Sequence, residues 1–177
     1  IILRDALRMP LKLVFTSAAQ RDHSGYTKWL IRRMDAVIAT SSQAASYLQV
    51  PHSIIMHGID TNRFVPPADK AAAKAVVGLD PAMKVFGCFG RIRSQKGTDR
   101  FVDAMIATMP ANSDWIAVIT GRVTAEHQGF ADAMHAKIAA AGLKDRFLFP
   151  GEVADVLPWY QALDLFAAPQ RWEGFGL

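Results

Sequence analysis

The chain has 177 residues, of which 51% are hydrophobic and 20% are charged, and its formal net charge is +4. This composition is typical of a globular protein and excludes a disordered chain, because it supplies enough apolar surface for a core. No apolar run approaches the ~20 residues that a membrane-spanning helix needs, and we see no signal peptide. The single cysteine, Cys88, lies in an apolar run and excludes a disulfide framework. We therefore expect a buried thiol and a cytoplasmic protein.

The positive charge is concentrated in the first third of the chain. Residues 1–66 carry eight Lys or Arg against four Asp, whereas the rest carries twelve charges of each sign. Such an excess indicates either an anionic partner, for example a membrane surface or an acidic acceptor, or an ordinary solvated face. Residues 26–33 leave the same choice open, because Trp29 stands there beside Lys28 and Arg33. They fit contact with the inner face of the cytoplasmic membrane, or a simple amphipathic helix.

Short elements alternate in the first part of the chain. In order, the pattern predicts a helix over 1–9, a strand over 11–16, a helix over 24–33 with Ser24 as its N-cap, a strand over 36–39, a helix that Thr40 or Ser41 caps and that runs to 48, and a strand over 53–56. The residues that follow, through Pro67, have neither a helical nor a strand period. We expect a crossover linker there.

The second part of the chain is more regular. In order, it predicts a helix over 68–77 that Gly78 ends, a strand over 84–89, a helix from 98 or 99 to 108, a strand over 115–120, a helix over 125–141, a strand over 147–149, a helix over 153–161 and a strand over 163–167. Phe101, Met105 and Met109 form an inward stripe on one helix. Because the strands are apolar on both faces and alternate with helices, the pattern predicts an α/β fold with a parallel sheet covered on both sides.

A loop rich in glycine and cations follows the strand predicted over 84–89. It reads Gly90-Arg91-Ile92-Arg93-Ser94-Gln95-Lys96-Gly97. In an open α/β sheet, ligands bind outside the carboxyl ends of the strands, and the next helix presents its amides and positive dipole end there. Arg91 can bind phosphate oxygens with its planar fork, and Lys96 adds a point charge. The spacing matches neither a dinucleotide fingerprint nor a P-loop. It indicates a diphosphate-binding loop, with a solvated basic loop as the alternative.

The last residues place a carboxylate before a glycine turn. Glu173-Gly174-Phe175-Gly176 follows the predicted strand over 163–167. The glycines allow a tight turn whose amides can face a ligand, and Glu173 could bind a sugar hydroxyl or stabilise positive charge at an anomeric carbon. Taken alone, the segment also fits ordinary turn chemistry. Together with the cationic loop, it indicates an enzyme that uses a nucleotide sugar.

From about residue 54 to 177, the chain resembles a retaining glycosyltransferase of the GT-B type, in family GT4. The segments that carry the resemblance are Met56-His57-Gly58-Ile59-Asp60 followed by Phe64, Gly90-Arg91 with Lys96-Gly97, Gly151 before a helix with Trp159 and Tyr160, and Glu173 to Gly176. The variant Pro169-Gln170-Arg171-Trp172-Glu173 is similar to bacterial lipopolysaccharide-core mannosyltransferases. That likeness favours GDP-mannose as the donor and leaves UDP-glucose open.

The resemblance implies roles for individual residues. Glu173 is implied as the catalytic carboxylate near the transferred sugar. The implied donor-binding residues are Gly90, Arg91 and Lys96 at the diphosphate, Gly174, Phe175 and Gly176 at the sugar or phosphate, and the backbone from Gly151 to Val153 at the base. Arg122 is a weaker candidate for phosphate or ribose, and it could equally be a surface arginine.

The chain departs from the family pattern at several positions. Many members have a histidine where this chain has Thr16, and His23 is either a substitute or a loop residue without a role. His57 stands where the family usually has asparagine. No Asp-x-Asp pair occurs in the sequence, so we expect no bound metal and no other cofactor. In GT-B enzymes, cations and helix dipoles take the place of a metal at the diphosphate.

The resemblance also implies a domain organisation. Residues 1–58 would be the C-terminal part of an N-terminal, acceptor-side Rossmann-like domain, residues 59–67 an interdomain linker, and residues 68–177 a truncated Rossmann-like domain that binds the nucleotide sugar. Because the sequence starts within a predicted helix and stops within a site-like loop, we expect a fragment of a longer enzyme, inactive alone.

The sequence therefore predicts a hexosyltransferase that retains anomeric configuration and acts in lipopolysaccharide or other cell-surface glycan synthesis. Its expected partners are a nucleotide-sugar donor and a glycan or glycolipid acceptor, and no nucleic acid. Two alternatives stay open: a non-catalytic nucleotide-binding α/β module and a GT-B sugar-nucleotide epimerase.

Overall fold

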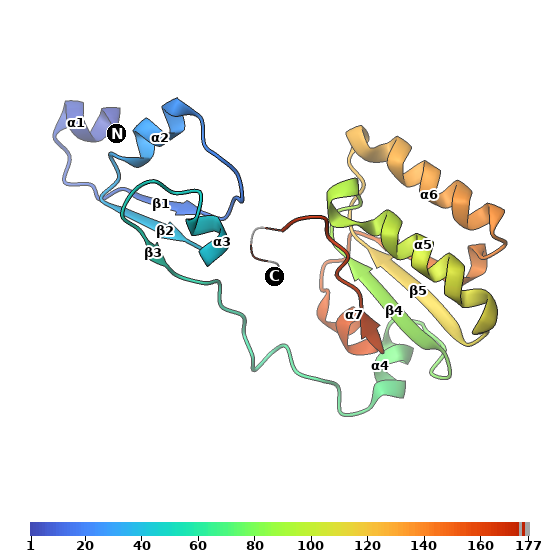
Figure 1. Cartoon of the computed structure of the whole chain (residues 1–177). Coiled ribbons are helices and arrows are strands. Elements are labelled where there is room, and N and C mark those ends of the chain that lie inside the picture. Colours follow the sequence, from blue (N-terminus) through green and yellow to red (C-terminus); the bar gives the residue numbers. More distant parts are fainter. Residues whose placement is uncertain (174, 176–177) are drawn as a thin grey trace. The chain divides into compact units, whose positions relative to one another are not determined.

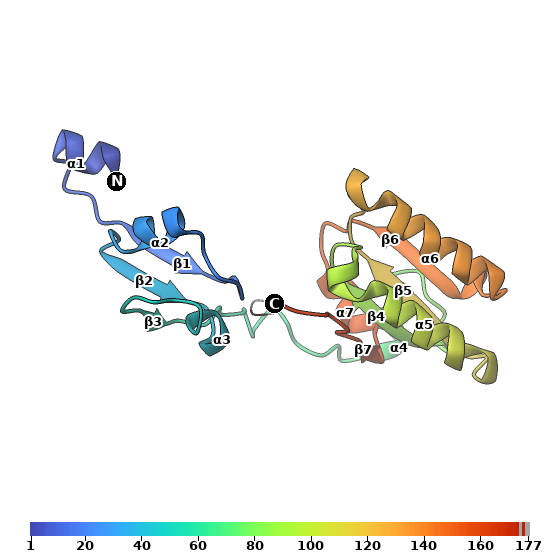
Figure 2. The same cartoon turned by 45° about the horizontal axis from the view of Figure 1, so that its top comes forward.

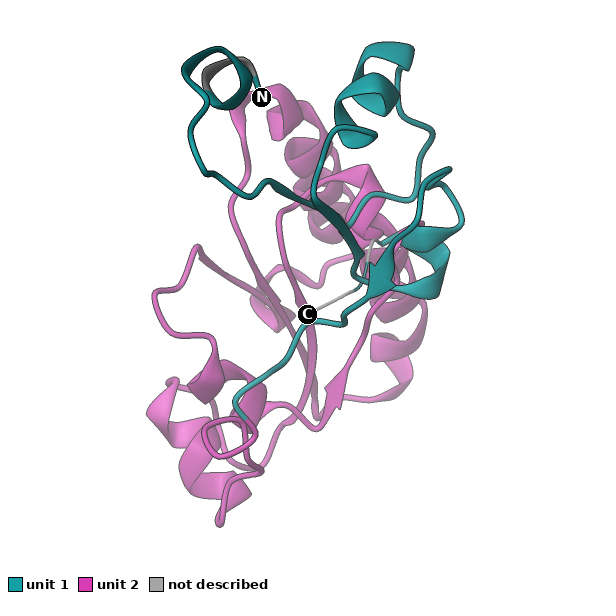
Figure 3. Cartoon of the chain, turned by 90° about the vertical axis from the view of Figure 1, so that its left-hand side faces the viewer, with its two compact units in different colours: residues 1–60, 173–177 teal, residues 61–172 magenta. Residues whose placement is uncertain are grey.

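The computed structural model describes residues 1–173 and 175, with their side chains except those of residues 2 and 3. The chain forms two compact units, which Figure 3 shows in different colours. Unit 1 comprises Ile1–Asp60 and Glu173–Leu177, and unit 2 comprises Thr61–Trp172. The division after Asp60 falls within the segment that the sequence assigns to a linker. Residues 173–177 are grouped with unit 1, whereas the sequence assigns them to the second domain.

Unit 1 contains a small parallel sheet with the strand order β1-β2-β3 (Figure 1). Its elements are α1 (Ile2–Leu7), β1 (Val14–Ser17), α2 (Gly25–Ile31), β2 (Ala36–Ala39), α3 (Ser42–Ala45) and β3 (Ser53–Ile54). The side chains that pack its core come from α2, β2, α3 and the turn after α3: Ile31, Val37, Ala39, Ala45 and Leu48. The alternation of strand and helix thus agrees with the prediction.

Serine side chains begin two helices of unit 1. Ser24 Oγ accepts a hydrogen bond from the Thr27 amide at 3.2 Å, as the sequence predicts. Ser41 rather than Thr40 caps α3, since its Oγ accepts from the Ala44 amide at 3.0 Å. The prediction that α3 runs to residue 48 was wrong. A tight turn follows the helix, in which the Leu48 amide donates to the Ala45 carbonyl and Leu48 enters the core.

Unit 2 is built around a parallel four-stranded sheet with the order β6-β5-β4-β7. Its helices and strands are α4 (Lys70–Val76), β4 (Lys84–Phe89), α5 (Thr98–Thr108), β5 (Trp115–Thr120), α6 (Gln128–Ala140), β6 (Phe147–Gly151), α7 (Leu157–Ala162) and β7 (Leu165–Phe166), with 3-10 turns at Ser94–Lys96, Met109–Ala111, Ala125–His127 and Lys144–Arg146. The predicted bounds of β4 and β5 were correct. Because β7 returns to pair with β4, the strand order reverses beside β4.

Both faces of this sheet are covered, as the apolar strands predict (Figure 1 and Figure 2). Ala117 and Ile119 of β5 pack with residues of α5 and α6, whereas Val118 points to the other face and packs with Ala162 of α7. The predicted inward stripe is also confirmed: Phe101, Met105 and Met109 are all buried. The successive strand residues serve two cores, one on each face.

Three helix starts in unit 2 differ from the prediction. Helix α6 begins at Gln128 rather than at 125, because residues Ala125–His127 form a 3-10 turn. Helix α4 begins only after Asp69, whose carboxylate accepts hydrogen bonds from the amides of Ala71 and Ala72. Helix α7 begins at Leu157 rather than at 153, because Asp155 Oδ1 accepts from the Leu157 amide at 3.0 Å and ends the preceding loop. A capping side chain therefore decides the start of α4, whereas the N-cap residue of α7, Val156, makes no side-chain capping bond.

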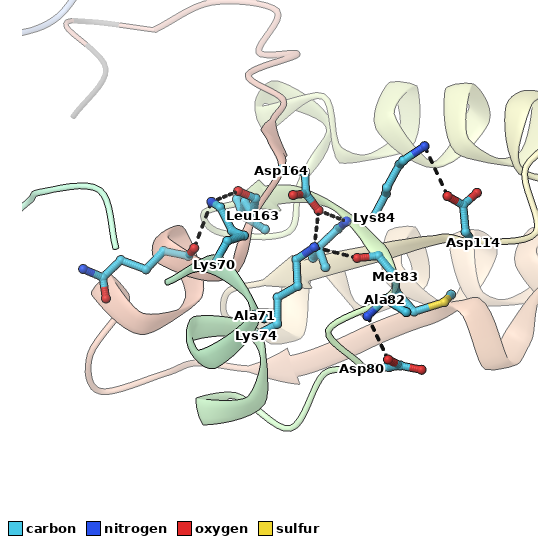
Figure 4. Close-up of polar contacts among 12 residues, drawn as sticks. Lys70, Ala71, Lys74, Asp80, Ala82, Met83, Lys84, Asp114, Leu163 and Asp164 are labelled. Atoms are coloured by element: carbon cyan, nitrogen blue, oxygen red, sulfur yellow. Dashed lines mark hydrogen bonds and ion pairs between the residues drawn. The ribbon is translucent and has the colours of Figure 1, made fainter. Parts of the chain in front are cut away.

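A salt bridge ties the amino ends of β4 and β7 to α4 (Figure 4). Lys74 is only 5% exposed, and its Nζ lies 2.8 Å from Asp164 Oδ2 and 2.7 Å from the Met83 carbonyl oxygen. Asp164 also accepts a hydrogen bond from the Val85 amide at 2.7 Å. A buried ammonium is tolerated here because each contact replaces a bond to water.

Residues 55–69 contain neither helix nor strand. Within unit 2, an ion pair between Arg63 Nη2 and Asp155 Oδ1 at 3.0 Å holds this segment at Arg63. A hydrogen bond from Gln161 Nε2 to the Val65 carbonyl at 3.1 Å holds it two residues further along. In the part of the chain that the structure describes, no helix is both long and apolar enough to cross a membrane.

Candidate active site

The loops that follow the strands of unit 2 meet at the carboxyl edge of its sheet. The Gly90 amide, just after β4, donates to the Thr120 carbonyl at the end of β5 at 2.9 Å. The Gly121 amide, just after β5, donates to the Gly151 carbonyl at the end of β6 at 2.8 Å. In parallel α/β sheets this edge, next to the strand where the order reverses, is where ligands bind. The geometry thus places Gly90, Gly121 and Gly151 side by side there.

At this edge of the sheet, the backbone geometry at position 121 requires a glycine. Its φ is 140°, which side-chain-bearing residues rarely adopt, and a Cβ there would lie 2.0 Å from the Gly90 carbonyl oxygen. The backbones that leave β4 and β5 can therefore approach each other only without a side chain. The result is a partly buried strip of peptide backbone rather than a wall of side chains, which leaves room for a ligand to approach the backbone closely.

Lys96 folds back over the start of its own loop. It lies in the 3-10 turn Ser94–Lys96 and is half-buried. Its Cδ and Cε atoms would lie 3.9 Å from a Cβ built on Gly90. Burial raises the pKa of Cys88 to about 11, and the positive charge of Lys96 opposes that rise. The ammonium of Lys96 thus stands near the carboxyl end of β4. The sequence analysis expects a cation that binds phosphate at this place.

Two further cations lie on this edge and are exposed, Arg91 and Arg122. The Arg122 carbonyl accepts a hydrogen bond from the Ile92 amide at 3.1 Å, which places its backbone beside the loop after β4. The guanidinium of Arg122 lies 3.9 Å from Glu152, an exposed pair that contributes little to stability. Val153 follows that glutamate and is half-buried.

The structure brings together five of the candidate residues within unit 2: Gly90, Arg91, Lys96, Arg122 and Val153. Glu173 and Phe175 belong to unit 1 instead. The backbone oxygen of Glu173 accepts a hydrogen bond from Gln20 Nε2, and the Phe175 ring meets the His57 ring edge-on at 5.3 Å. Gly174 and Gly176 lie outside the residues that the structure describes.

The histidine that the sequence considered as a substitute, His23, is packed within unit 1. Its ring meets the Phe15 ring edge-on, with the centroids 5.9 Å apart. His23 is half-buried, whereas Thr16 in β1 is exposed. This contact fits a packing role for His23.

The sequence missed a pair of charged residues beside the cationic loop. Arg171 binds Asp99 with both arms of its guanidinium, at 2.8 Å to Oδ1 and 2.6 Å to Oδ2. These hydrogen bonds are the main reason that the pKa of Asp99 lies below its usual value; burial opposes them, and the charge of Arg171 and the amides of Asp99 and Arg100 add to the lowering. Asp99 stands in the first turn of α5. Its carboxylate therefore occupies part of the positive N-terminal end of this helix, which the sequence analysis assigned to a ligand.

The chemistry of this edge suits an anion with two adjacent negative groups. Partly buried glycine backbone lies next to one half-buried ammonium and two exposed guanidinium groups, and a buried sheet lies behind them. Cations held beside a low-dielectric interior attract a diphosphate more strongly than scattered surface charges do.

The chain is similar in sequence to known glycosyl transferases. Residues 83–177 match the family described as glycosyl transferases group 1. The chain is 61% identical over all of its 177 residues to the lipopolysaccharide core biosynthesis mannosyltransferase LpsB of Rhizobium meliloti (strain 1021). The match covers 100% of this chain and 50% of that relative, so the chain spans about half of the relative's length.

Solved structures with the same fold include two informative neighbours. The C-terminal domain of a glycosyl transferase group 1 family protein (LpcC) from Francisella tularensis superposes with a TM-score of 0.64 at 36% identity, over 68% of this chain and 63% of that one. Anabaena Alr3699/HepE, solved in complex with UDP and glucose, superposes with a TM-score of 0.82 at 24% identity, over 99% of this chain and 50% of that one. The second likeness concerns the fold alone.

Proposed function

The chain belongs to the glycosyl transferases group 1 family, and from this premise we propose that the full-length protein is a hexosyltransferase of lipopolysaccharide synthesis. Its fold is of the GT-B type, as predicted. The observation that carries the proposal is the carboxyl edge of unit 2, where Gly90, Gly121 and Lys96 form a site suited to a diphosphate. The 61% identity to a lipopolysaccharide core mannosyltransferase supports mannose as the sugar.

In this proposal unit 2 binds the donor and unit 1 is part of the acceptor-side domain. Arg91 and Lys96 bind the diphosphate and stabilise the negative charge that develops on it as the glycosidic bond breaks. Glu173 stabilises the positive charge that develops at the anomeric carbon, and the sugar is transferred with retention. Arg122 and the backbone near Val153 bind the nucleoside.

GDP-mannose is the favoured donor, and a lipopolysaccharide core oligosaccharide is the favoured acceptor. The test is to incubate the full-length protein with GDP-mannose or UDP-glucose and this acceptor, and to determine the product's anomeric configuration by NMR. We expect transfer of mannose with retention. Binding without turnover would replace the proposal with a nucleotide-binding module, and a change in the sugar of the donor without transfer would replace it with an epimerase.

No metal is needed in this mechanism, because Arg91 and Lys96 supply the positive charge at the diphosphate. We therefore expect the same rate of transfer before and after treatment with EDTA. A loss of activity that Mg²⁺ or Mn²⁺ restores would contradict this part of the proposal.

The surface formed by α2 and the turn that follows it, with Tyr26, Trp29 and Arg33, is proposed to contact the inner face of the cytoplasmic membrane. Tyr26 and Trp29 are 70% and 45% exposed, their rings stack at 5.9 Å, and the guanidinium of Arg33 lies 3.9 Å from the Trp29 ring centroid. Aromatic rings beside cations suit an anionic lipid surface. We expect the full-length protein to float with vesicles that contain phosphatidylglycerol, and Trp29→Ala with Arg33→Ala to weaken this. Unchanged flotation of that variant would mean that α2 is an ordinary solvated helix.

A further inference from the structure

Arg171 joins two loops that are far apart in the sequence. Its guanidinium donates to both carboxylate oxygens of Asp99 and also to the carbonyl oxygen of Ser94. The side chains of Arg171 and Asp99 are 32% and 27% exposed, so the pair is partly shielded from solvent. A planar guanidinium that faces a carboxylate with two parallel bonds fixes direction as well as distance.

Backbone contacts strengthen the same junction. The Arg171 amide donates to the Gln95 carbonyl at 2.9 Å, and Gln95 Nε2 donates to the Trp172 carbonyl at 3.2 Å. Gly97 has a φ of 70°, and a Cβ there would lie 2.0 Å from the Pro169 carbonyl oxygen. Residues 169–172 are therefore held against residues 94–99 through side chains and backbone together.

The two joined loops carry the principal residues of the proposed reaction. Lys96 stands between Gln95 and Gly97, both of which take part in the junction. Glu173 is the next residue along the chain after Trp172, whose carbonyl is held by Gln95. The charge of Arg171 is matched by Asp99 at 2.6 Å, so Arg171 acts on its neighbours rather than as a ligand of phosphate.

We infer that Arg171 and Asp99 are positioning residues, which hold the loop of Lys96 and the backbone that leads into Glu173 in one arrangement. This inference rests on the proposed glycosyl transfer for its kinetic consequences and on the contacts alone for its structural ones. Preorganised groups accelerate a reaction only when they are held near the productive geometry, and small displacements are costly. Loss of the pair should lower kcat more than it raises KM for the donor.

The structural consequence is tested by hydrogen exchange in the full-length protein. Arg171→Ala and Asp99→Ala should each speed exchange of the Arg171 amide, which is bonded to Gln95 in the intact junction. The matched control is Asp103→Ala. Asp103 stands one turn further along α5 and pairs with Lys137 of α6 at 2.5 Å, away from the junction. It should leave exchange of that amide unchanged. Wild-type exchange in Arg171→Ala would overturn the inference, whether or not the protein transfers sugar.

The kinetic consequence is tested with the same variants. We expect Arg171→Ala and Asp99→Ala each to lower kcat about 10- to 100-fold, with a smaller change in donor KM. The double variant should be no worse than either single one, because residues that act as a unit are not additive. Arg171→Lys, which keeps the charge but not the fork, should recover part of the rate, and Asp103→Ala should keep the wild-type rate.

The outcomes separate this inference from the proposed function. If the wild-type protein shows no transfer, the proposed function fails and the exchange experiment still decides the positioning role. If the wild type is active and both single variants retain its kcat, the positioning role fails and the proposed function stands. Losses that add in the double variant would also overturn the inference, because the residues would then act separately.

Discussion

At the amino end of the unit 2 sheet, Lys74 is 5% exposed and is bonded to both Asp164 and the Met83 carbonyl. At the carboxyl end of the same sheet, Arg91 and Arg122 are exposed and stand beside a strip of glycine backbone. Both ends thus carry cations on elements of one sheet. At the amino end the cation is matched within the fold, whereas at the carboxyl end two guanidinium groups face solvent.

The difference follows from how a parallel sheet is connected. All strands point the same way, so every loop after a strand opens at the carboxyl end and can contribute to a common site. The amino end receives the chain from the covering helices, and charges there serve packing. We therefore expect substitutions at the amino end to change stability and substitutions at the carboxyl end to change binding and catalysis.

The largest effect is expected at Glu173, which follows the loop at the carboxyl end. Glu173→Gln should lower kcat about 100- to 1,000-fold, as for other groups that stabilise developing charge. Donor affinity should change little, because the charge matters most in the transition state. Steady-state kinetics of the full-length protein with GDP-mannose would measure this. An unchanged kcat would make Glu173 a turn residue.

At the amino end, Asp164→Ala should lower the free energy of unfolding by about 3 kcal/mol, because it leaves the ammonium of Lys74 buried without its carboxylate. Urea denaturation would measure the loss, and calorimetry should find GDP binding unchanged. The control is Asp114→Ala, which breaks a salt bridge to Lys84 whose side chains are 46% and 61% exposed. It should cost less than about 1 kcal/mol. Equal losses would erase the proposed contrast between buried and exposed pairs.

At the carboxyl end, Arg91→Ala or Lys96→Ala should weaken GDP binding by ~1.5–3 kcal/mol, the range for hydrogen bonds to charged groups. GMP binding should weaken less, because GMP lacks one of the two phosphate groups. Titration calorimetry would measure both, and added salt should reduce the effect to the extent that ions enter the site. Arg100, which is exposed on α5, is the control, and Arg100→Ala should be near neutral. Equal losses for all three variants would indicate a diffuse basic surface.

The smallest expected effect is a change in the stability of the protein at acidic pH. Burial raises the pKa of Asp164, but hydrogen bonds from Lys74 and the Val85 amide, with the charges of Lys74 and Lys70, outweigh it and hold the pKa below the usual value. A carboxyl group whose pKa is lower in the folded than in the unfolded state stabilises the fold at every pH above its pKa in the unfolded state. This stabilisation is lost as the pH falls through the pKa of the folded state. The difference in Tm between wild type and Asp164→Asn should thus be constant above about pH 5 and shrink below about pH 4. A difference that grows in acid would reverse the assigned sign.

Much of the fold could be predicted from the sequence because its signals are local. The bounds of β4 and β5 were correct, since an apolar run next to a glycine or a polar residue marks a buried strand. Ser24 was identified as an N-cap because a serine side chain can accept a hydrogen bond from an amide in the first turn of the helix that follows. The positions of Gly90 and Lys96 at the strand end followed from the same reasoning. The family was identified from short motifs, each made of residues that are adjacent in the sequence.

Only the tertiary structure decided which distant residues meet. Lys74 reads as an exposed lysine in an alanine-rich helix, and its burial becomes clear only when β7 pairs with β4 and brings Asp164 to it. Asp99 and Arg171 are 72 residues apart and show no pattern that links them. The physical reason is that secondary structure depends on neighbours within a few residues, whereas ion pairs between loops depend on the order in which strands join the sheet. That order is a property of the whole fold.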